Sequence, residues 1–415
     1  MMLRSILISN GAFVIKAFFA FALTTYLANS MKTEDFATWS ILISVSMFFT
    51  LSDFGAGQYL LRRFVAGIGV EGFELERKTL VLNSKVVFLI VSVFFMFVSI
   101  FVAGFYPGLN ELKQSALLLF FVLVLARTFF TPYLALLSAY EFFHLRKVIE
   151  ATTYVAAFLV VYLASSFDFS VAAIINAYAI VFFVGAVAPF FLCRHLKLIS
   201  GFAGFDSVSK SVVTEILVSS VPYFINNLSL LVTRGGLVFF AGLLLIDTEV
   251  VVLAIYYALF YQVVFQFFDI VVRSLQPRAL SNPRGYKKAE FLLYIFLVCF
   301  VFCGAFGGEV ILGLLYPKIS FEYSSMLIFI VLGAVEILFS MMNAKWQMDS
   351  RFNGLVALSS MVKAIMYLVF FVLFSFGYTS DTLHGFLLGV LWINIFVVSV
   401  SALFQYVKGI HRYEA

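Results

Sequence analysis

Long runs of apolar residues separated by short polar breaks form the dominant pattern along the chain. A hydrocarbon core of about 30 Å needs about 20 apolar residues in a helix, and the sequence contains twelve segments of about this length. The pattern therefore predicts an all-α membrane protein with twelve transmembrane helices. We place the spans at 5–29, 36–60, 81–105, 114–138, 147–166, 170–193, 212–235, 248–274, 289–315, 323–344, 354–377 and 384–407.

Composition supports this interpretation. Of the 415 residues, 63% are hydrophobic and only 12% are charged. In soluble domains, roughly 45–50% of the residues are apolar and roughly 25% are charged. A soluble enzyme is thereby excluded. The loops between the predicted spans are too short to fold as separate domains. We expect no metal site at Cys299 and Cys303, because no histidine lies near them in the sequence.

Basic residues are distributed unevenly between the two sets of loops. Nineteen of the 27 Lys and Arg fall in the terminal segments, alternate loops and adjoining helix ends, and only Lys32, Lys113 and Lys318 fall in the opposite loops. Such a bias places the basic side in the cytoplasm, so we expect both termini to be cytoplasmic. The net charge of +5 is then an orientation signal. It does not indicate nucleic-acid binding, because the basic residues do not form one patch.

A polar linker at 194–211 divides the predicted spans into two sets of six, which suggests a duplication. We predict a bundle at 1–193, this cytoplasmic linker, and a second bundle at 212–415. Pseudo-symmetric halves of this kind suit a transporter with a central cavity between two rocking bundles. Four pairs of short matches occur in the same order in both halves: Thr33-Glu34 with Thr248-Glu249, Asp53 with Asp269, Tyr106-Pro107 with Tyr316-Pro317, and Ala139 and Arg146 with Ala344 and Arg351.

Two cations lie deep in the first six spans. Lys16 and Arg127 are each about 11 residues from the inner end of their span, which is roughly 16 Å at 1.5 Å per residue. A charge at this depth is costly and normally faces a bundle interior or a wet cavity. No acid lies in the middle of these spans, so we expect a cationic central cavity that binds an anionic substrate. The alternative is that the lysine snorkels to the interface.

The second half is closer to charge balance. Lys363 and Glu336 lie at similar depths in spans eleven and ten, so we expect them to pair. Glu336 is either a proton carrier that couples transport to a gradient or only the partner of Lys363. Arg234 lies toward the outer end of its span and is a further candidate for substrate binding.

Other polar groups are candidates for contact or gating. Asp53 and Asp269 lie near the cytoplasmic ends of matching spans beside arginines, where an ion pair would close a gate. Asn10 and Asn226 are candidates for hydrogen bonds to sugars, although such groups also cross-link helices.

Several stretches resemble one family. Ser52-Asp53-Phe54-Gly55-Ala56-Gly57-Gln58, followed by Leu61-Arg62-Arg63, resembles the end of the second span of bacterial O-antigen flippases. The Tyr-Pro pairs at 106 and 316 and the run Val221-Pro222-Tyr223-Phe224-Ile225-Asn226-Asn227 are also similar. These flippases belong to the multidrug/oligosaccharidyl-lipid/polysaccharide exporter superfamily. One departure is Thr233-Arg234-Gly235-Gly236, which lacks the acid that often follows the arginine in this family.

The resemblance implies a flippase of the bacterial inner membrane. Its substrate is then an undecaprenyl-pyrophosphate-linked oligosaccharide repeat, moved from the cytoplasmic to the periplasmic leaflet, with proton or sodium coupling and no bound cofactor. An O-antigen polymerase and a chain-length regulator are the implied partners. The alternative is a cation-coupled multidrug exporter, which is expected to have an acidic cavity. A membrane enzyme such as a polymerase is disfavoured, because the outer loops are short.

Overall fold

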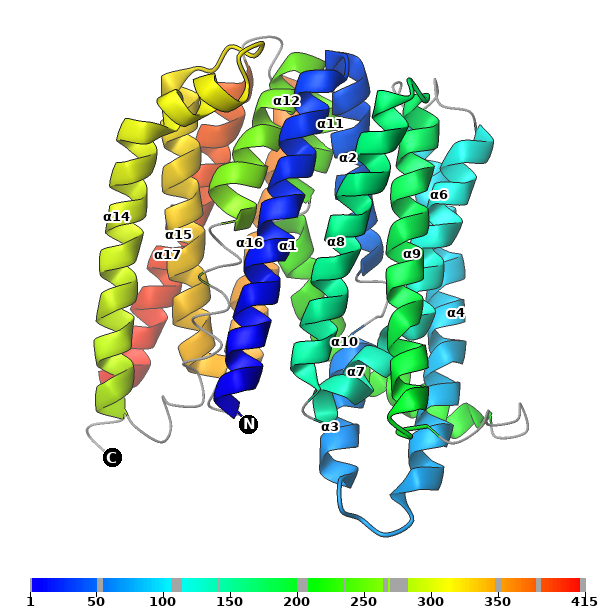
Figure 1. The fold of residues 1–415 in the computed structure, drawn as a ribbon. Helices are drawn as coiled ribbons and strands as arrows, with labels where there is room; N and C mark the ends of the chain where they lie inside the picture. Colours follow the sequence, from blue (N-terminus) through cyan, green and yellow to red (C-terminus); the bar gives the residue numbers. More distant parts are fainter. Residues whose placement is uncertain are drawn as a thin grey trace. The chain divides into compact units, whose positions relative to one another are not determined.

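The computed structural model describes residues 2–50, 55–105, 114–140, 142–199, 208–233, 236–263, 268, 283–347, 353–377 and 382–410. All regular elements in these ranges are helices (Figure 1). Nine of them are long and apolar enough to cross a membrane, and they coincide with predicted spans one, three to six and nine to twelve. The prediction of an all-α, multi-pass membrane fold is confirmed. The helices form two compact units, residues 1–231 and 232–415.

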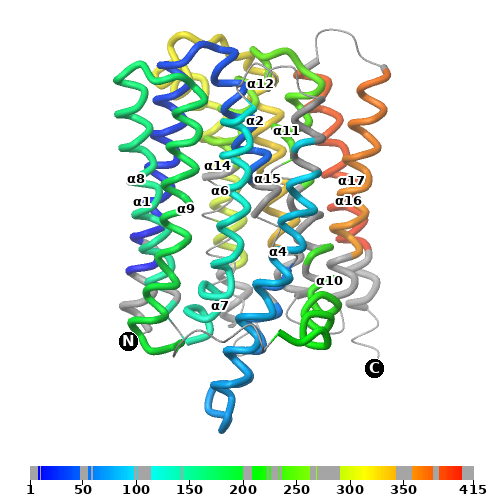
Figure 2. Tube along the Cα trace, turned by 90° about the vertical axis from the view of Figure 1, so that its right-hand side faces the viewer, coloured from blue at the N-terminus to red at the C-terminus, as the bar shows by residue number. Residues whose placement is uncertain are grey.

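The first unit consists of helices packed lengthwise. The long helix α1 packs along α8, α8 along α9, and α6 along α9; Figure 2 shows α1, α8 and α9 side by side. The elements of this unit are α1 (Met2–Ser30), α2 (Thr33–Thr50), α3 (Ala56–Gly67), α4 (Phe73–Phe105), α6 (Gln114–Ala126), η1 (Arg127–Phe130), α7 (Thr131–Ala139), α8 (Phe143–Ser166), α9 (Val171–His195) and α10 (Lys210–Thr233).

Helix α10, which we assigned to the second half of the sequence, packs within the first unit. The Tyr59 hydroxyl of α3 donates to Glu215 Oε1 at 2.7 Å, and the Ser209 amide donates to Asn83 Oδ1 at 2.8 Å. Ile216 is fully buried in the same apolar core as Tyr59. These contacts connect the start of α10 to α3 and α4.

Two predicted spans are interrupted in the structure. The second span, predicted at 36–60, is divided into α2 and α3, and Gly55 before α3 has a φ of 73°, a value that favours glycine. The fourth span contains the 3₁₀ turn η1 between α6 and α7. Pro132 explains this turn, because proline has no N–H to donate to the carbonyl of Thr128 four residues earlier. The Thr131 amide donates to that carbonyl instead.

The second unit is also helical, and its core is rich in aromatic rings. Helix α15 packs against α14 and α17, and α16 against α17. Phe371 stacks on Phe240 and Phe386, with ring centroids 4.4 and 5.6 Å apart. The elements are α11 (Gly236–Leu244), α12 (Asp247–Tyr256), the π-helical segment η3 (Tyr257–Val263), α14 (Pro283–Leu315), α15 (Tyr323–Gln347), α16 (Asn353–Gly377) and α17 (Thr382–Ile410).

Candidate functional site

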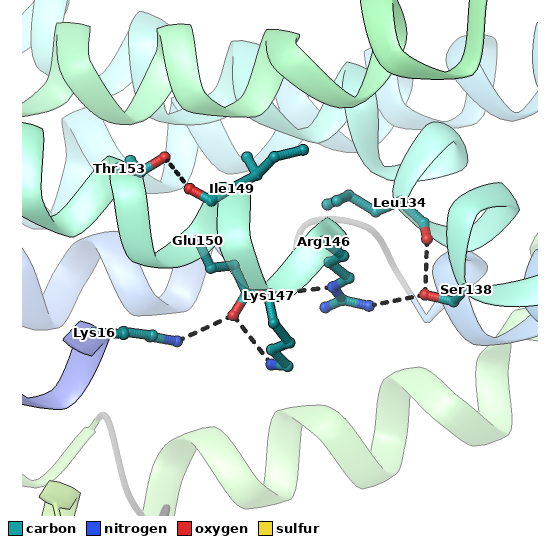
Figure 3. A network of polar contacts seen from close by, with 8 residues as sticks. All are labelled: Lys16, Leu134, Ser138, Arg146, Lys147, Ile149, Glu150 and Thr153. Carbon is teal, nitrogen blue, oxygen red and sulfur yellow. Dashed lines mark hydrogen bonds and ion pairs between the residues drawn. The ribbon is translucent and has the colours of Figure 1, made fainter. Parts of the chain in front are cut away.

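Lys16 is paired in the structure, contrary to our expectation. Its ammonium lies 3.3 Å from Glu150 Oε2. The same carboxylate holds Lys147 Nζ at 3.1 Å and Arg146 Nε at 3.1 Å (Figure 3). Three cations from two helices therefore share this one carboxylate.

The expectation that no acid reaches Lys16 was wrong for a geometric reason. We estimated depth from helical rise alone, but helical side chains point back toward the N-terminus of their helix. Lys16 therefore extends toward the side where α1 begins, and Glu150 lies two turns into α8, which begins at the same side (Figure 1). The lysine bends toward that side, as a snorkelling side chain does, and meets a carboxylate on the way.

Arg127 lies in the 3₁₀ turn η1. Its guanidinium carbon is 5.0 Å from the centroid of the Phe182 ring, a distance typical of a cation–π contact. Among the described residues, no carboxylate oxygen lies close enough to the Arg127 guanidinium, within 4.0 Å, to form an ion pair. The turn is fixed to α4, because the Thr128 hydroxyl lies 3.1 Å from that of Ser92 and both residues are buried.

Two aromatic residues connect Lys16 to Arg127, and two more pack beside them. We call the four the aromatic cluster: Trp39, Tyr154, Tyr178 and Phe182. Lys16 Nζ is 5.2 Å from the Tyr154 centroid. Tyr154 meets Phe182 edge to face at 5.0 Å, and Phe182 also meets Tyr178 at 4.4 Å. Trp39 extends the cluster from α2, 5.1 Å from Tyr178.

The structure thus brings the two predicted cations into one network. Lys16 contacts Tyr154, Tyr154 contacts Phe182, and Phe182 contacts Arg127. The sequence analysis did not identify the aromatic residues, because one residue in five is aromatic and nothing distinguishes these from the rest. The spacing of four between Tyr178 and Phe182 on α9 became informative only once Arg127 was placed.

The predicted pair in the second half is confirmed. Lys363 on α16 binds Glu336 on α15, and each side chain is only 2% exposed. The ammonium also lies 4.7 Å from the Phe339 centroid. Beside it, the Asn394 amide of α17 donates to the Tyr367 hydroxyl. This buried polar network joins the three helices α15, α16 and α17.

The structure does not describe the other candidates. Arg234, Asp53 and Asp269 lie outside the described residues. Asn10 and Asn226 lie in α1 and α10, but their side chains are outside the described part. The proposed gate and sugar contacts at these positions stay predictions.

Comparison with known proteins gives matches among solved structures only. No family model matches the chain, and no curated protein matches it. The lipid II flippase MurJ, in an inward closed conformation, matches with a TM-score of 0.74 at 12% identity, over 96% of this chain and 87% of MurJ. An inward-facing MATE multidrug resistance transporter of the MOP superfamily matches with a TM-score of 0.67 at 14% identity, over 94% of both chains.

A MATE transporter from Vibrio cholerae also matches, with a TM-score of 0.62 at 13% identity, over 99% of this chain and 97% of that one. Identities this low show the fold alone, because one fold supports several functions. The chain therefore has the helical fold shared by MATE transporters and MurJ.

Proposed function

We propose that this protein flips a lipid-linked oligosaccharide across the bacterial inner membrane, with both termini in the cytoplasm. The substrate is an undecaprenyl-pyrophosphate-linked repeat unit of the kind used for O-antigen. A polymerase and a chain-length regulator would act next on the product. The fold supports a transporter, and one of the similar structures is the flippase for lipid II.

The observation that carries this proposal is the environment of Arg127. Its guanidinium cannot lose its charge at physiological pH, lies inside a membrane-spanning element, and has no carboxylate partner among the described residues. A cation in this setting is stabilised by an anionic ligand, and arginine binds phosphate through two parallel hydrogen bonds. The Phe182 ring lies 5.0 Å from the guanidinium carbon.

The aromatic cluster suits the sugar part of such a substrate. Tyrosine and tryptophan combine a large apolar face with a polar edge, and a sugar ring presents apolar C–H groups as well as hydroxyls. Tyr154 and Phe182 lie directly between the two cationic centres. We assign the diphosphate to the cations and the first sugar to this cluster.

The energy source is proposed to be a proton or sodium gradient. Glu336 is the predicted coupling residue, but its tight pairing with Lys363 and its burial favour a structural role in joining α15 to α16. We therefore assign coupling to other acids of the chain, with Asp53 and Asp269 as the candidates.

A strain that lacks the gene and carries plasmid-borne variants tests the proposal. We expect Arg127→Ala to abolish surface polysaccharide and to cause undecaprenyl-linked single repeats to accumulate, with unchanged protein level. Arg127→Lys should retain part of the activity, because the charge remains. Arg194→Ala is a matched control, since it removes an exposed arginine of the same unit.

A multidrug exporter is the second candidate, because MATE transporters share the fold. An aromatic cluster also suits planar cationic drugs. The positive charges of Lys16 and Arg127 at its ends oppose this, since like charges repel. Overexpression that raises resistance to cationic drugs, without effect on surface polysaccharide, would establish this candidate in place of the flippase.

A further inference from the structure

We propose that one face of helix α14 is a docking surface for a transmembrane helix of another membrane protein, and that this partner helix carries a lysine or an arginine. The surface consists of Phe302, Phe306, Glu309 and Gly313, and we call it the α14 face. The inference goes beyond the proposed function, because it holds whichever substrate the protein carries.

Close packing on α15 determines which side of α14 is left uncovered (Figure 1). A Cβ at Gly304 would lie 3.0 Å from the Ile330 side chain, and both positions are part of this contact. A Cβ at Gly308 would lie 2.8 Å from Met326 Sδ. Glu309 lies about 100° further round the helix than Gly308 and about 140° from Gly304. Its side chain therefore faces away from α15.

The α14 face is exposed along its length. Phe302 and Phe306 are 59% and 78% exposed, and their rings stack with centroids 6.3 Å apart. Glu309 and Gly313 are also exposed, and nothing would lie within 4 Å of a Cβ at Gly313. The spacings of four, three and four residues place all of them on one side of the helix. Lipid readily covers the aromatic rings, but a carboxylate on such a surface is costly.

Glu309 lies at the depth of the hydrocarbon core. The apolar span 290–315 is about 39 Å long at 1.5 Å per residue, which exceeds a core of about 30 Å by about 9 Å. Glu309 precedes the end of α14 at Leu315 by about 9 Å of helix. In a centred span, its backbone is then about 4–5 Å inside the core.

The direction of the Glu309 side chain places the carboxylate deeper still. Helical side chains point toward the N-terminus of their helix. The membrane surface nearer to Glu309 lies at the C-terminal end of α14, so the side chain is directed toward the middle of the bilayer. Its short stem does not extend to the nearer surface, as the stem of a snorkelling lysine does.

The chain itself supplies no counter-charge in the part that the structure describes. Glu309 forms no hydrogen bond or ion pair with another described residue. A carboxylate in this setting is stabilised by a cation or a hydrogen-bond donor on a neighbouring helix. Charge complementarity therefore selects a helix with a lysine or an arginine at the same depth. Gly313, one turn further along, lets the backbone of that helix approach closely.

A second copy of this chain does not satisfy the same requirement. Two copies in one membrane have the same orientation, and a symmetric contact would place Glu309 opposite Glu309. Like charges at close range repel. We therefore assign the α14 face to a different membrane protein, whose basic residue supplies the missing charge.

Binding of designed single-span peptides in liposomes tests the proposal. The purified full-length protein carries a donor dye at its C-terminus, and energy transfer to an acceptor on the peptide measures association. One peptide is a leucine-rich helix with a lysine at the depth of Glu309, and the matched peptide has leucine at that position. We expect the lysine peptide to bind about tenfold more tightly than the leucine peptide, the effect of one interhelical polar contact.

Variants of α14 separate charge from shape. Glu309→Leu should bind the two peptides equally, and Glu309→Gln should keep part of the preference, because its amide still accepts a hydrogen bond. Gly313→Leu should weaken the binding of both peptides by blocking close approach. Glu290→Gln is a matched control, since it changes an acid at the other end of α14 that accepts from the Tyr294 hydroxyl, and it should bind as the wild type does.

Equal affinity of the wild type for the two peptides would overturn the proposal, and this comparison needs no variant to fold. A preference for lysine that persists in Glu309→Leu would also overturn it. Binding of neither peptide would show that lipid alone covers the α14 face. Energy transfer between donor-labelled and acceptor-labelled copies of the protein, abolished by Glu309→Leu, would assign the surface to a second copy instead. Each of these results leaves the flipping assay on Arg127 unaffected.

Discussion

The buried pair of Lys363 and Glu336 permits a quantitative test of the second unit. Both side chains are only 2% exposed, so removal of either partner leaves an unpaired charge in an apolar interior. Loss of one partner of a buried ion pair typically costs about 3–5 kcal/mol. We expect Lys363→Met to destabilise the protein by this amount, and Glu336→Leu to do so by a similar amount.

The double variant should behave very differently. Replacing a buried ion pair by apolar residues of similar volume is often neutral or stabilising. Lys363→Met combined with Glu336→Leu should therefore lie within about 1.5 kcal/mol of the wild type, the usual limit for volume-conserving exchanges. Because each single variant costs at least about 3 kcal/mol and the double variant at most about 1.5 kcal/mol, the coupling energy between the two sites would be at least about 4.5 kcal/mol. This exceeds the range of about 0.5–3 kcal/mol that is usual for residues in contact.

Equilibrium denaturation in mixed micelles measures these free energies. Lys32→Met is the control, because Lys32 is exposed and surface substitutions usually change stability by less than about 0.5 kcal/mol. Single variants that cost no more than this control, or a double variant whose cost is the sum of the two singles, would refute the paired, buried arrangement.

Two further predictions concern the same unit. Glu322, in the loop before α15, has its pKa lowered by hydrogen bonds from the Ser324 and Ser325 hydroxyls. These hydrogen bonds contribute to the free energy of unfolding above the unfolded-state pKa of Glu322. Their contribution is lost as the pH falls through the lower folded-state pKa. Ser324→Ala should raise the pKa of Glu322 toward its unfolded-state value, so that the variant is less stable at pH 7 and loses less thermal stability on acidification than the wild type. Identical melting profiles from pH 7 to pH 3 would contradict this. Gly389→Ala should cost about 1–3 kcal/mol through overpacking, because its new Cβ would lie 2.2 Å from the Phe370 ring. Gly313→Ala, where nothing lies within 4 Å, should not lower the melting temperature, and an equal loss in both would refute the packing argument.

Hydrophobic patterning was sufficient to predict an all-helical, multi-pass membrane fold. Nine predicted spans correspond to long apolar helices in the structure, because the bilayer leaves helices and closed barrels as the only spanning structures. The breaks within spans could not be placed in the same way. The turn at Arg127–Phe130 depends on Pro132 and on packing against α4, and proline inside a span is often accommodated without a break.

Contacts between candidate residues could be predicted where the two residues lie at the same depth in the membrane on adjacent spans. Lys363 and Glu336 pair as expected, because both point into the same unit at similar depth. Lys16 was misjudged, because its long side chain reaches Glu150, which lies nearer the helix end. The spacing of Arg146, Lys147 and Glu150 by three and four residues was visible, and it indicates one helix face. We counted Arg146 and Lys147 as loop charges and therefore did not use this spacing.

In the proposed function, the cations of the first unit bind an anionic lipid headgroup during transport. Flipping of a fluorescent undecaprenyl-pyrophosphate-linked repeat in proteoliposomes tests it most directly, with Arg127→Ala compared with the wild type at equal protein incorporation. We predict that Arg127→Ala loses flipping and that Arg127→Lys keeps part of it. Flipping by Arg127→Ala at the wild-type rate would contradict the claim.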